Sequence, residues 1–504
     1  MVLNMKNDMA SSPYYTVVRP SNCLDRMFYL QHRVGAQSNV LVSAHYAPTT
    51  PTHDRLPKEA VYSAVYSIVE KYPELSLIAV REASNNGKQH RLLLAAMHEI
   101  DLETCVEFHD DEEPVAGPKV IERIHNEWCW TDEQFNPRKP LWKVVVIGGC
   151  EVVFVFHHII CDGRFGQMFH HEFLSAINSF DQDHKPYSYI AKVDPERVKL
   201  SKKTEEFWTS STSVIRIIHV FVMLILLRFF VGRGLLFTNL PKPKQHTTSV
   251  LIEASPDNRT KTRVATIRIS AARMRRIIAA CRERKTSFTP LLIVMILSTL
   301  ACDYYPEAKV GLTNCALDMR SLYPQVQDGG RLLQCGGGTR KLTWLNRYRR
   351  VCRSESSRKG HITMDVDRAW QLVKDYRAAI AGATEGKEPP VLVAFRAGNA
   401  IADDLEGTLK STLPALGLHL NNCFQVSNLG SFSVTEQHGQ WTIHDMSFSA
   451  STVNGNISYN IAVHVVGVEG GDTVVNASYE DGIFTEETIT GILEGTLGRI
   501  EAMM

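Results

Sequence analysis

The stretch VVFVFHHIICDGRFGQMFHHEFLSAI, residues 152–177, decides the interpretation of this 504-residue sequence. Its first five residues, Val152–Phe156, are all apolar and predict a strand that is buried on both faces. His157 and His158 follow at once, and Asp162 comes within the next four residues. The remainder has the apolar spacing of a helix. A strand, a turn and a helix in this order would hold imidazole and carboxylate groups rigidly at a strand end.

The two adjacent histidines are the first candidates for chemistry. Neighbouring side chains on an extended backbone point to opposite sides, so one ring faces a cavity while the other packs or hydrogen-bonds inward. An imidazole titrates at a pH of about 6.5 and can take a proton from a hydroxyl near neutral pH. We expect Asp162 either to orient an imidazole or to pair with a distant arginine, and Gly163 to permit a tight turn or a close approach.

Three other interpretations of these residues stay open at this point. The first is a metal site, which His170 and His171 would enlarge, although the sequence has no HExxH spacing and adjacent histidines diverge. The second is a pair of histidines satisfied inside the core. The third is nucleophilic catalysis by Cys161 beside His158, although the GxSxG pattern of a serine nucleophile is missing.

The surrounding sequence predicts a mixture of strands and helices. Trp142–Ile147 and Gly148-Gly149 complete a hairpin with the buried strand. Because strands and helices mix along the whole sequence, the expected class is α/β or α+β. The other expected elements are strands at Asn39–Tyr46, Ser76–Val80, Arg91–Ala95, Arg263–Ile269, Val310–Asn314, Asn422–Val426, Asn456–Val468 and Thr473–Tyr479, and helices at Lys58–Tyr72, Ile121–Trp130, Ala271–Arg284, Pro290–Leu300, Met364–Ala381 and from about Thr485.

Composition and charge exclude several classes of protein. Hydrophobic residues make up 44% and charged residues 22%, as in ordinary globular proteins. The 55 Lys and Arg residues nearly balance the 54 Asp and Glu residues, so the net charge does not favour electrostatic binding of nucleic acid by the whole protein. Eleven cysteines without a CxxC pair indicate neither a zinc framework nor a disulfide scaffold. Free thiols and an N-terminal sequence without a signal-peptide pattern favour the cytoplasm.

Residues 214–237, VIRIIHVFVMLILLRFFVGRGLLF, form the most apolar stretch. The uninterrupted apolar run Val220–Leu227 is far shorter than the roughly 20 residues of a membrane span, and Arg228 would lie near its centre. The alternatives are an interfacial helix that makes the protein peripheral to an intracellular membrane, a helix over an apolar substrate channel, and an ordinary buried helix.

Residues 328–361 are rich in glycine and in basic residues, and we expect a surface loop there. The run Gly336–Gly338 lacks the Lys-Ser/Thr ending of a phosphate-binding loop, so it does not indicate a nucleotide site.

The motif HHIICDG resembles the HHxxxDG motif of the CoA-dependent acyltransferase superfamily, which includes chloramphenicol acetyltransferase, the plant BAHD enzymes and peptide-synthetase condensation domains. Three longer stretches are similar to the fungal alcohol acetyltransferase family within it. They are residues 17–46, residues 140–177 with Pro-Leu-Trp ahead of the strand, and residues 422–432 with the segment Ser-Asn-Leu-Gly.

This resemblance implies a fold of two chloramphenicol-acetyltransferase-like lobes. Each lobe would be a mixed sheet with flanking helices, and the active-site tunnel would lie between them. The expected organisation is a disordered lead-in over 1–16, an N-terminal lobe over 17–205, a linker with the apolar helix over 206–245, and a C-terminal lobe over 246–504.

The resemblance also implies roles for individual residues. His158 would be the general base, and His157 would be structural. Asp162, grouped with His158 in the catalytic motif, would point away from the cleft and pair with Arg320 of the segment Asp-Met-Arg. Gly163 would keep the turn open beside the substrate channel.

The DFGWG motif of the plant enzymes is missing, so the donor to the oxyanion is unassigned. Ser427 and Asn428 are candidates for oxyanion or acyl-site contacts, and a strand-to-turn corner is the structural alternative.

The activity implied is that of an O-acetyltransferase. It would move an acetyl group from acetyl-CoA to the hydroxyl of a small lipophilic acceptor, such as a secondary metabolite or an alcohol, without a covalent intermediate and without a metal. It would act as a monomer and bind no nucleic acid. Two alternatives remain: a catalytically silent relative that binds an acyl carrier or a hydrophobic ligand, and a metal-dependent hydrolase.

Overall fold

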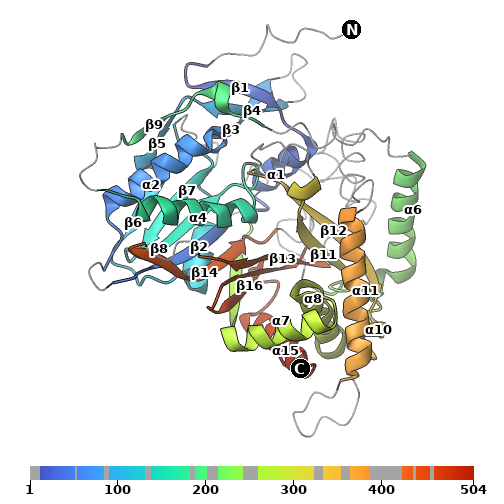
Figure 1. The fold of residues 1–504 in the computed structure, drawn as a ribbon. Coiled ribbons are helices and arrows are strands. Elements are labelled where there is room, and N and C mark those ends of the chain that lie inside the picture. Colours follow the sequence, from blue (N-terminus) through green and yellow to red (C-terminus); the bar gives the residue numbers. More distant parts are fainter. Residues whose placement is uncertain are drawn as a thin grey trace.

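The structure is a computed structural model, and two lobes of strands and helices lie side by side in it (Figure 1). The expected α/β class with two lobes is confirmed. The residues that the structure describes are 12–33, 35–50, 54–83, 90–130, 138–181, 188–200, 214–241, 259–322, 333–352, 364–385, 423–434, 439–453 and 459–504. Most of the expected lead-in, residues 1–11, lies outside them.

The N-terminal lobe is built on a five-stranded sheet of order β14-β2-β8-β7-β6. The hairpin between β7 and β8 turns at Gly148 and Gly149, whose φ angles of 56° and 74° favour glycine. Its strands are β2 (Val40–Pro48), β6 (Val106–His109), β7 (Trp142–Ile147), β8 (Glu151–Phe156) and β14 (Trp441–Ala450).

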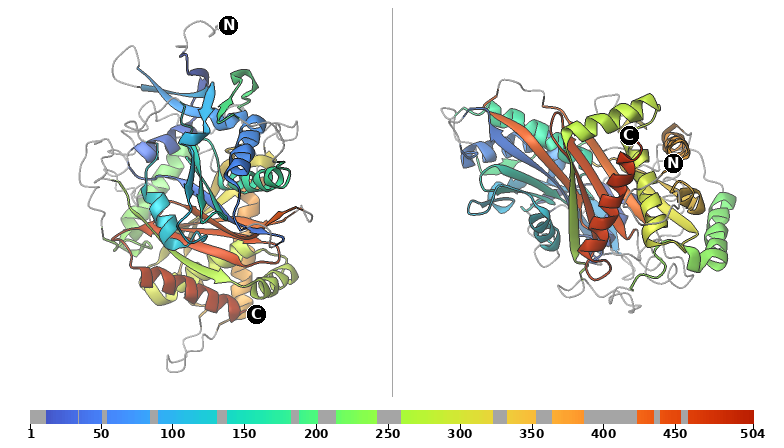
Figure 2. Two further views of the ribbon diagram at one scale, coloured as in Figure 1. Left: turned by 90° about the vertical axis from the view of Figure 1, so that its left-hand side faces the viewer. Right: turned by 90° about the horizontal axis from the view of Figure 1, so that it is seen from below.

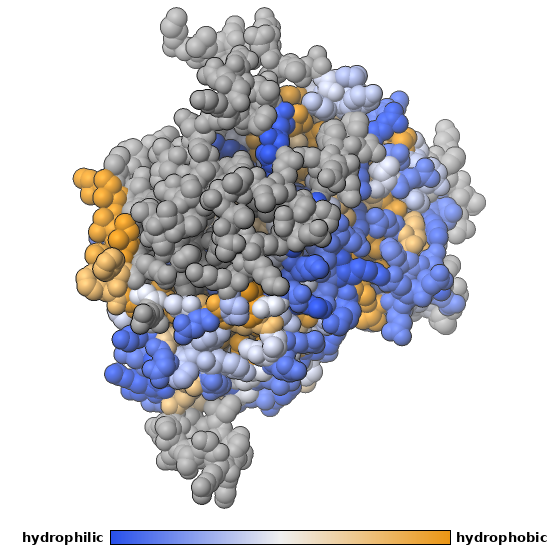
Figure 3. Space-filling view, turned by 180° about the vertical axis from the view of Figure 1, so that it is seen from behind, coloured by the Kyte–Doolittle hydropathy of each residue, from blue (hydrophilic) through white to orange (hydrophobic). Residues whose placement is uncertain are grey.

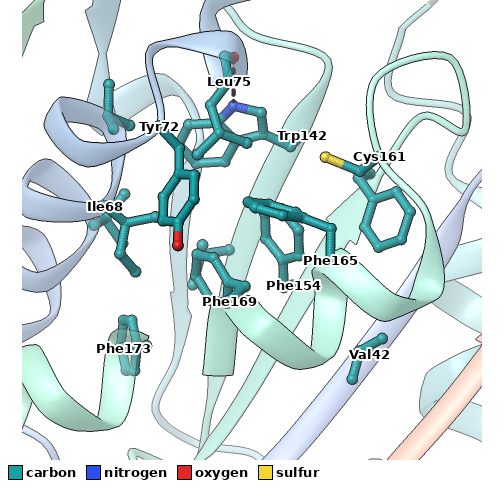
Figure 4. Close-up of a cluster of buried hydrophobic side chains, with 14 of the residues drawn as sticks. Val42, Ile68, Tyr72, Leu75, Trp142, Phe154, Cys161, Phe165, Phe169 and Phe173 are labelled. Carbon is teal, nitrogen blue, oxygen red and sulfur yellow. Dashed lines mark hydrogen bonds between the residues drawn. The ribbon is translucent and has the colours of Figure 1, made fainter. Parts of the chain in front are cut away.

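Helices cover both faces of this sheet, which explains why every residue of β8 is buried. On one face Phe154 stacks on Phe169 with ring centroids 4.1 Å apart, and Trp142 donates a hydrogen bond to the Leu75 carbonyl oxygen at 2.9 Å (Figure 4). Burial of each such side chain contributes about 1.5–3 kcal/mol, so the end of β8 is firmly held. The helices are α2 (Lys58–Lys71) and α4 (Gly163–Asn178) on this face and α3 (Pro118–Asn126) on the other.

Smaller elements complete this lobe. The part of this lobe that follows α4 includes a short strand, Ile190–Lys192. The remaining elements are a three-stranded sheet of β1 (Tyr15–Pro20), β4 (His90–Met97) and β3 (Leu77–Ala83), a two-stranded sheet of β5 (Glu99–Asp101) and β9 (Ile190–Lys192), and the helix α1 (Cys23–Arg33).

The C-terminal lobe has a six-stranded sheet of order β10-β16-β15-β13-β11-β12. Helices cover one face, where a second apolar core forms. The strands are β10 (Thr262–Ile269), β11 (Val310–Asp318), β12 (Gly336–Trp344), β13 (Cys423–Phe432), β15 (Ile461–Val468) and β16 (Thr473–Glu480), and the helices are α7 (Ala271–Glu283), α8 (Phe288–Thr299), α10 (Asn346–Arg349), α11 (Val366–Glu385) and α15 (Glu486–Glu501).

One expectation for this lobe is wrong: residues 336–344 form the edge strand β12, not a surface loop. The glycines serve close packing, because a Cβ on Gly337 would lie 2.5 Å from the Met319 Cγ atom. All nine residues of β12 pair with β11, from Gly336 with Asp318 to Trp344 with Val310.

The strand β14 ties the two lobes together. It comes from the C-terminal part of the sequence but pairs antiparallel with β2 of the N-terminal lobe, with Phe448 opposite Val42. Figure 2 shows the orange and red strands lying against the blue and teal ones. The expected domain limits near 205 and 245 stay predictions, since 201–213 and 242–258 lie outside the described residues.

The apolar stretch at 214–237 begins with the helix α6 (Val214–Val231) at the edge of the molecule, where it forms the orange surface on the left of Figure 3. Ile215, Phe229 and Phe230 are 78%, 86% and 80% exposed, so α6 is not an ordinary buried helix. Among the helices described, none alone has the length and hydropathy of a membrane span. The helices α7 and α8, the latter extended to Tyr304, reach that length and hydropathy only when they are taken together, and they meet at a sharp bend. However, α8 is buried in the core.

Candidate active site

His157 turns inward at the end of β8. It is 4% exposed, and its Nδ1 accepts a hydrogen bond from the Ile159 N–H at 3.0 Å. Its ring packs beside the rings of His32 and Trp130, with centroid distances of 4.7 Å and 6.0 Å. Burial lowers the pKa of His157 well below its ordinary value, and the charges of His32 and His158 add to this shift. The side chain is therefore a neutral part of the core.

His158 has different surroundings and remains partly exposed. Its Nδ1 lies 3.0 Å from the Cys161 carbonyl oxygen, and its ring stacks on Phe28 with centroids 4.0 Å apart. A carbonyl oxygen only accepts, so Nδ1 carries the hydrogen and Nε2 carries the lone pair. Burial lowers the pKa of His158, while the Asp162 charge and the Cys161 hydrogen bond oppose this shift. The ring is thus a neutral base of fixed tautomer.

Asp162 is the N-cap of α4 and joins the two lobes. Its Oδ1 accepts from the Phe165 N–H and from Arg320 Nη2, both at 2.9 Å, and its Oδ2 accepts from the Cys335 N–H at 2.7 Å. Arg320 also donates to the Leu333 carbonyl oxygen at 3.0 Å. Burial by itself would lower the pKa of Arg320, but the neighbouring Asp162 carboxylate outweighs this effect and raises the pKa above its ordinary value. Both carboxylate oxygens of Asp162 are therefore engaged in holding the turn.

Gly163 lies where the lobes meet. A Cβ at this position would be 2.9 Å from the ring of Phe448 on β14 and 3.0 Å from Leu429 on β13. Any larger residue would push these strands away from the start of α4. The close approach expected after Asp162 is present.

The expected pair Ser427 and Asn428 lies on β13, one residue before Leu429. The Asn428 amide donates to Thr289 Oγ1 at 3.0 Å and accepts from the Gly430 N–H at 2.8 Å, so it braces the corner of the strand. Ser427 is partly exposed and stands opposite His464 of β15 in the parallel register.

His464 is a residue that the sequence analysis missed. It is 1% exposed, and neither ring nitrogen has a hydrogen-bond partner among the described residues. Burial, together with the smaller effect of the His158 charge, lowers the pKa of His464 to about 3. An unpaired buried donor costs about 1–3 kcal/mol. The available signal was a single polar residue in the otherwise apolar strand IAVHVVGV.

The structure gives little support to a nucleophilic role for Cys161 or to a metal site that includes His170. Burial raises the pKa of the Cys161 thiol well above its ordinary value, which disfavours a nucleophilic thiolate. His170 is bonded to Tyr46 and to the Val42 carbonyl oxygen, both at 3.0 Å, and does not join His158. Within the described parts of the chain, no cluster of three or more His, Cys, Asp or Glu residues could hold a metal ion.

Comparisons with known proteins identify the relatives of this chain. The family model described as alcohol acetyltransferase matches residues 23–322. The probable alcohol acetyltransferase crmB of Aspergillus fumigatus is 22% identical over 496 residues, covering 92% of this chain and 95% of that protein.

Among solved structures, the trichothecene 15-O-acetyltransferase TRI3 of Fusarium sporotrichioides has a TM-score of 0.71 at 13% identity, covering 98% of this chain and 97% of that one. The condensation domain of the monacolin K polyketide synthase MokA has a TM-score of 0.55 at 11% identity, covering 97% and 98%. The match of the family model extends over more than half of the sequence. The chain therefore belongs to the alcohol acetyltransferase family.

Proposed function

We propose that this acetyltransferase moves the acetyl group of acetyl-CoA to the hydroxyl of a small lipophilic acceptor, with His158 as general base. The observation that supports it is the hydrogen bond from His158 Nδ1 to the Cys161 carbonyl oxygen, which leaves the Nε2 lone pair available. A neutral imidazole held in one tautomer is the group that such a proton transfer needs.

In the proposed reaction, Nε2 of His158 takes the hydroxyl proton while the acceptor oxygen bonds to the thioester carbon. The carbonyl electron pair moves to its oxygen and gives a tetrahedral oxyanion. When this pair returns, the carbon–sulfur bond breaks, and the CoA thiolate takes the proton back from Nε2. No acyl group becomes attached to the protein, and His158 ends the cycle neutral.

We infer that the other residues of the motif hold His158 in position. Asp162 and Arg320 fix the turn that carries His158, and the Asp162 charge favours the protonated imidazole that forms during the transfer. The ring of Phe28 stacks on His158, and the ring of Phe448 lies against Gly163. These apolar surroundings favour a lipophilic acceptor over a strongly hydrated one.

Steady-state kinetics with acetyl-CoA and a panel of linear and terpenoid alcohols test this proposal, with mass spectrometry to detect a gain of one acetyl group. We expect His158→Ala to lower kcat by about 10²–10⁴-fold and to leave CoA binding nearly unchanged. His157→Ala is the control, and its main effect should be a lower melting temperature. A wild-type protein that binds CoA but transfers nothing would support the silent relative. Loss of activity with a chelator would support the hydrolase.

We further propose that α6 contacts the cytoplasmic surface of an intracellular membrane. The support is its exposed apolar face and a helix sequence without Asp or Glu. Flotation with vesicles of phosphatidylcholine and phosphatidylserine is the test. Ile215→Glu with Phe229→Glu should abolish flotation, whereas Leu342→Glu with Trp344→Glu, which adds the same two charges at exposed apolar sites on β12, should not. Equal flotation of all three proteins would contradict the proposal.

A further inference from the structure

We propose that the imidazole of His464 donates the hydrogen bond that stabilises the acyl oxygen in the tetrahedral intermediate. This inference rests on the proposed acetyl transfer and assigns its missing oxyanion donor. It brings to the reaction a residue of the C-terminal lobe, which lies outside the HHxxxDG motif.

The alternation of β15 places His464 on the face of the sheet that meets the N-terminal lobe. Val463 and Val465 belong to the apolar core of the C-terminal lobe. Val466 and Val468 belong to the core of the N-terminal lobe. His464 has the same phase as Val466, so its ring lies at the junction of the lobes.

The neighbours of His464 connect it to the start of α4. Its ring makes an edge contact with the ring of Phe448, with centroids 5.0 Å apart and an interplanar angle of 77°. The same Phe448 ring is the group that approaches Gly163, directly after Asp162. The rings of His464 and His158 are near enough to interact electrostatically. The Phe448 ring therefore lies against both the His464 ring and the start of α4.

The hydrogen bonding of His464 distinguishes it from structural histidines in the same protein. His125 is bonded to Asn39 at 2.6 Å and to Ser449 at 2.8 Å, and His170 is likewise bonded through both nitrogens. In the described part of the chain, His464 has no such partner on either nitrogen. A neutral imidazole always keeps one N–H, so the site contains an unpaired donor.

The ionisation of His464 suits a donor and not a second base. Burial holds the ring neutral near neutral pH, and a ring with so low a pKa takes up a proton poorly. Its N–H is fixed on a strand before any charge develops, as an effective oxyanion donor requires. Nothing is transferred in this role, because the proton stays on His464 while the oxyanion forms and collapses.

Three variants separate hydrogen bonding from packing. His464→Leu keeps most of the volume and removes the donor, while His464→Asn and His464→Gln keep an N–H near the positions of Nδ1 and Nε2. We expect His464→Leu to lower kcat by about 10²–10³-fold with little change in the KM for acetyl-CoA, and one of the two amides to restore much of this loss. Val465→Ala, on the opposite face of the same strand, is the packing control, and it should lower the melting temperature without this loss in kcat.

A binding experiment tests the same point without turnover. The trifluoroacetonyl thioether of CoA forms a tetrahedral hydrate, whereas the acetonyl thioether stays a planar ketone. We expect calorimetry to show that wild type prefers the fluorinated compound at least about tenfold, and that His464→Leu loses this preference but binds the planar ketone as before.

The outcomes distinguish the two proposals. If His464→Leu keeps both the wild-type kcat and the preference for the tetrahedral compound, His464 is not the donor, although acetyl transfer by His158 stands. Equal losses in the Leu, Asn and Gln variants together with a lower melting temperature also overturn the assignment, since they indicate packing. If wild type binds neither compound, the proposed function fails and this inference falls with it.

Discussion

Acidification should destabilise this protein between pH 6.5 and about pH 3, because several histidines are buried in neutral form. Burial lowers the pKa values of His32, His125 and His464 to about 3, with added effects of the nearby charges of Arg259, His464 and His158 respectively. In the unfolded chain each would titrate near 6.5. The unfolded state therefore binds more protons in this range, so the free energy of unfolding falls as the pH falls.

The size of this effect follows from the separation of the two pKa values. At pH 5, each of the three histidines costs about 2 kcal/mol of stability, or about 6 kcal/mol together. That is comparable to the whole stability of a typical domain. The pKa of buried Glu151 is raised by desolvation, and its protonation in the folded state offsets part of the loss.

Urea unfolding at pH 7.5, 6.5, 5.5 and 5.0, followed by tryptophan fluorescence, measures the effect. The midpoint should fall steadily below pH 6.5. His125→Asn, which keeps a hydrogen-bonding side chain without a titrating group, should reduce the slope by about a fifth, because buried His157 and His170 with their lowered pKa values contribute as well. A midpoint that does not change from pH 7.5 to 5.0, or a variant with the wild-type slope, would refute the reasoning.

Three further predictions concern the turn and one cysteine. Gly163→Ala should lower the free energy of unfolding in urea by about 1–3 kcal/mol, because the added Cβ meets the Phe448 ring. Phe448→Leu in the same chain should recover part of this stability. Equal stability of Gly163→Ala and wild type would contradict the prediction. Asp162→Asn should cost about 1.5–3 kcal/mol by the same assay, because it removes the charged acceptor of Arg320 while Asp318 stays paired with that guanidinium at 3.0 Å. A cost below about 1 kcal/mol would exclude a tight pair between Asp162 and Arg320. The thiol of Cys302 donates a hydrogen bond to the sulfur of Cys352 at 2.9 Å and thereby lowers the pKa of Cys352. Iodoacetamide should therefore label Cys352 before the buried cysteines. A different order of labelling in peptide mass spectrometry would refute this prediction.

The local parts of this fold were readable from the sequence. The run Val152–Phe156, the glycine pair after Ile147 and the helix after Asp162 each carry their own signal within a few residues. The alternation of a strand predicted that one of the two histidines turns inward. The family resemblance implied that this histidine is His157, and it also implied the pairing of Asp162 with Arg320.

Features that depend on distant segments were not readable. No local pattern predicted a strand at β14, whose partner β2 lies about four hundred residues earlier in the chain. The glycines of β12 have low strand propensity, and the need for glycine at position 337 becomes clear only from the Met319 side chain packed over it. His464 looked like one polar residue in an apolar strand, because its relation to His158 exists only after the lobes meet.

The passage of β14 into the neighbouring sheet means that the lobes are not interchangeable modules. A fragment that ends at residue 245 would leave β2 with an unpaired backbone edge, and such edges promote aggregation. Chimeras between members of the family should therefore exchange residues 441–450 together with the N-terminal lobe. For the same reason, two halves of a chain divided at 245 should regain a folded enzyme only when they are produced together.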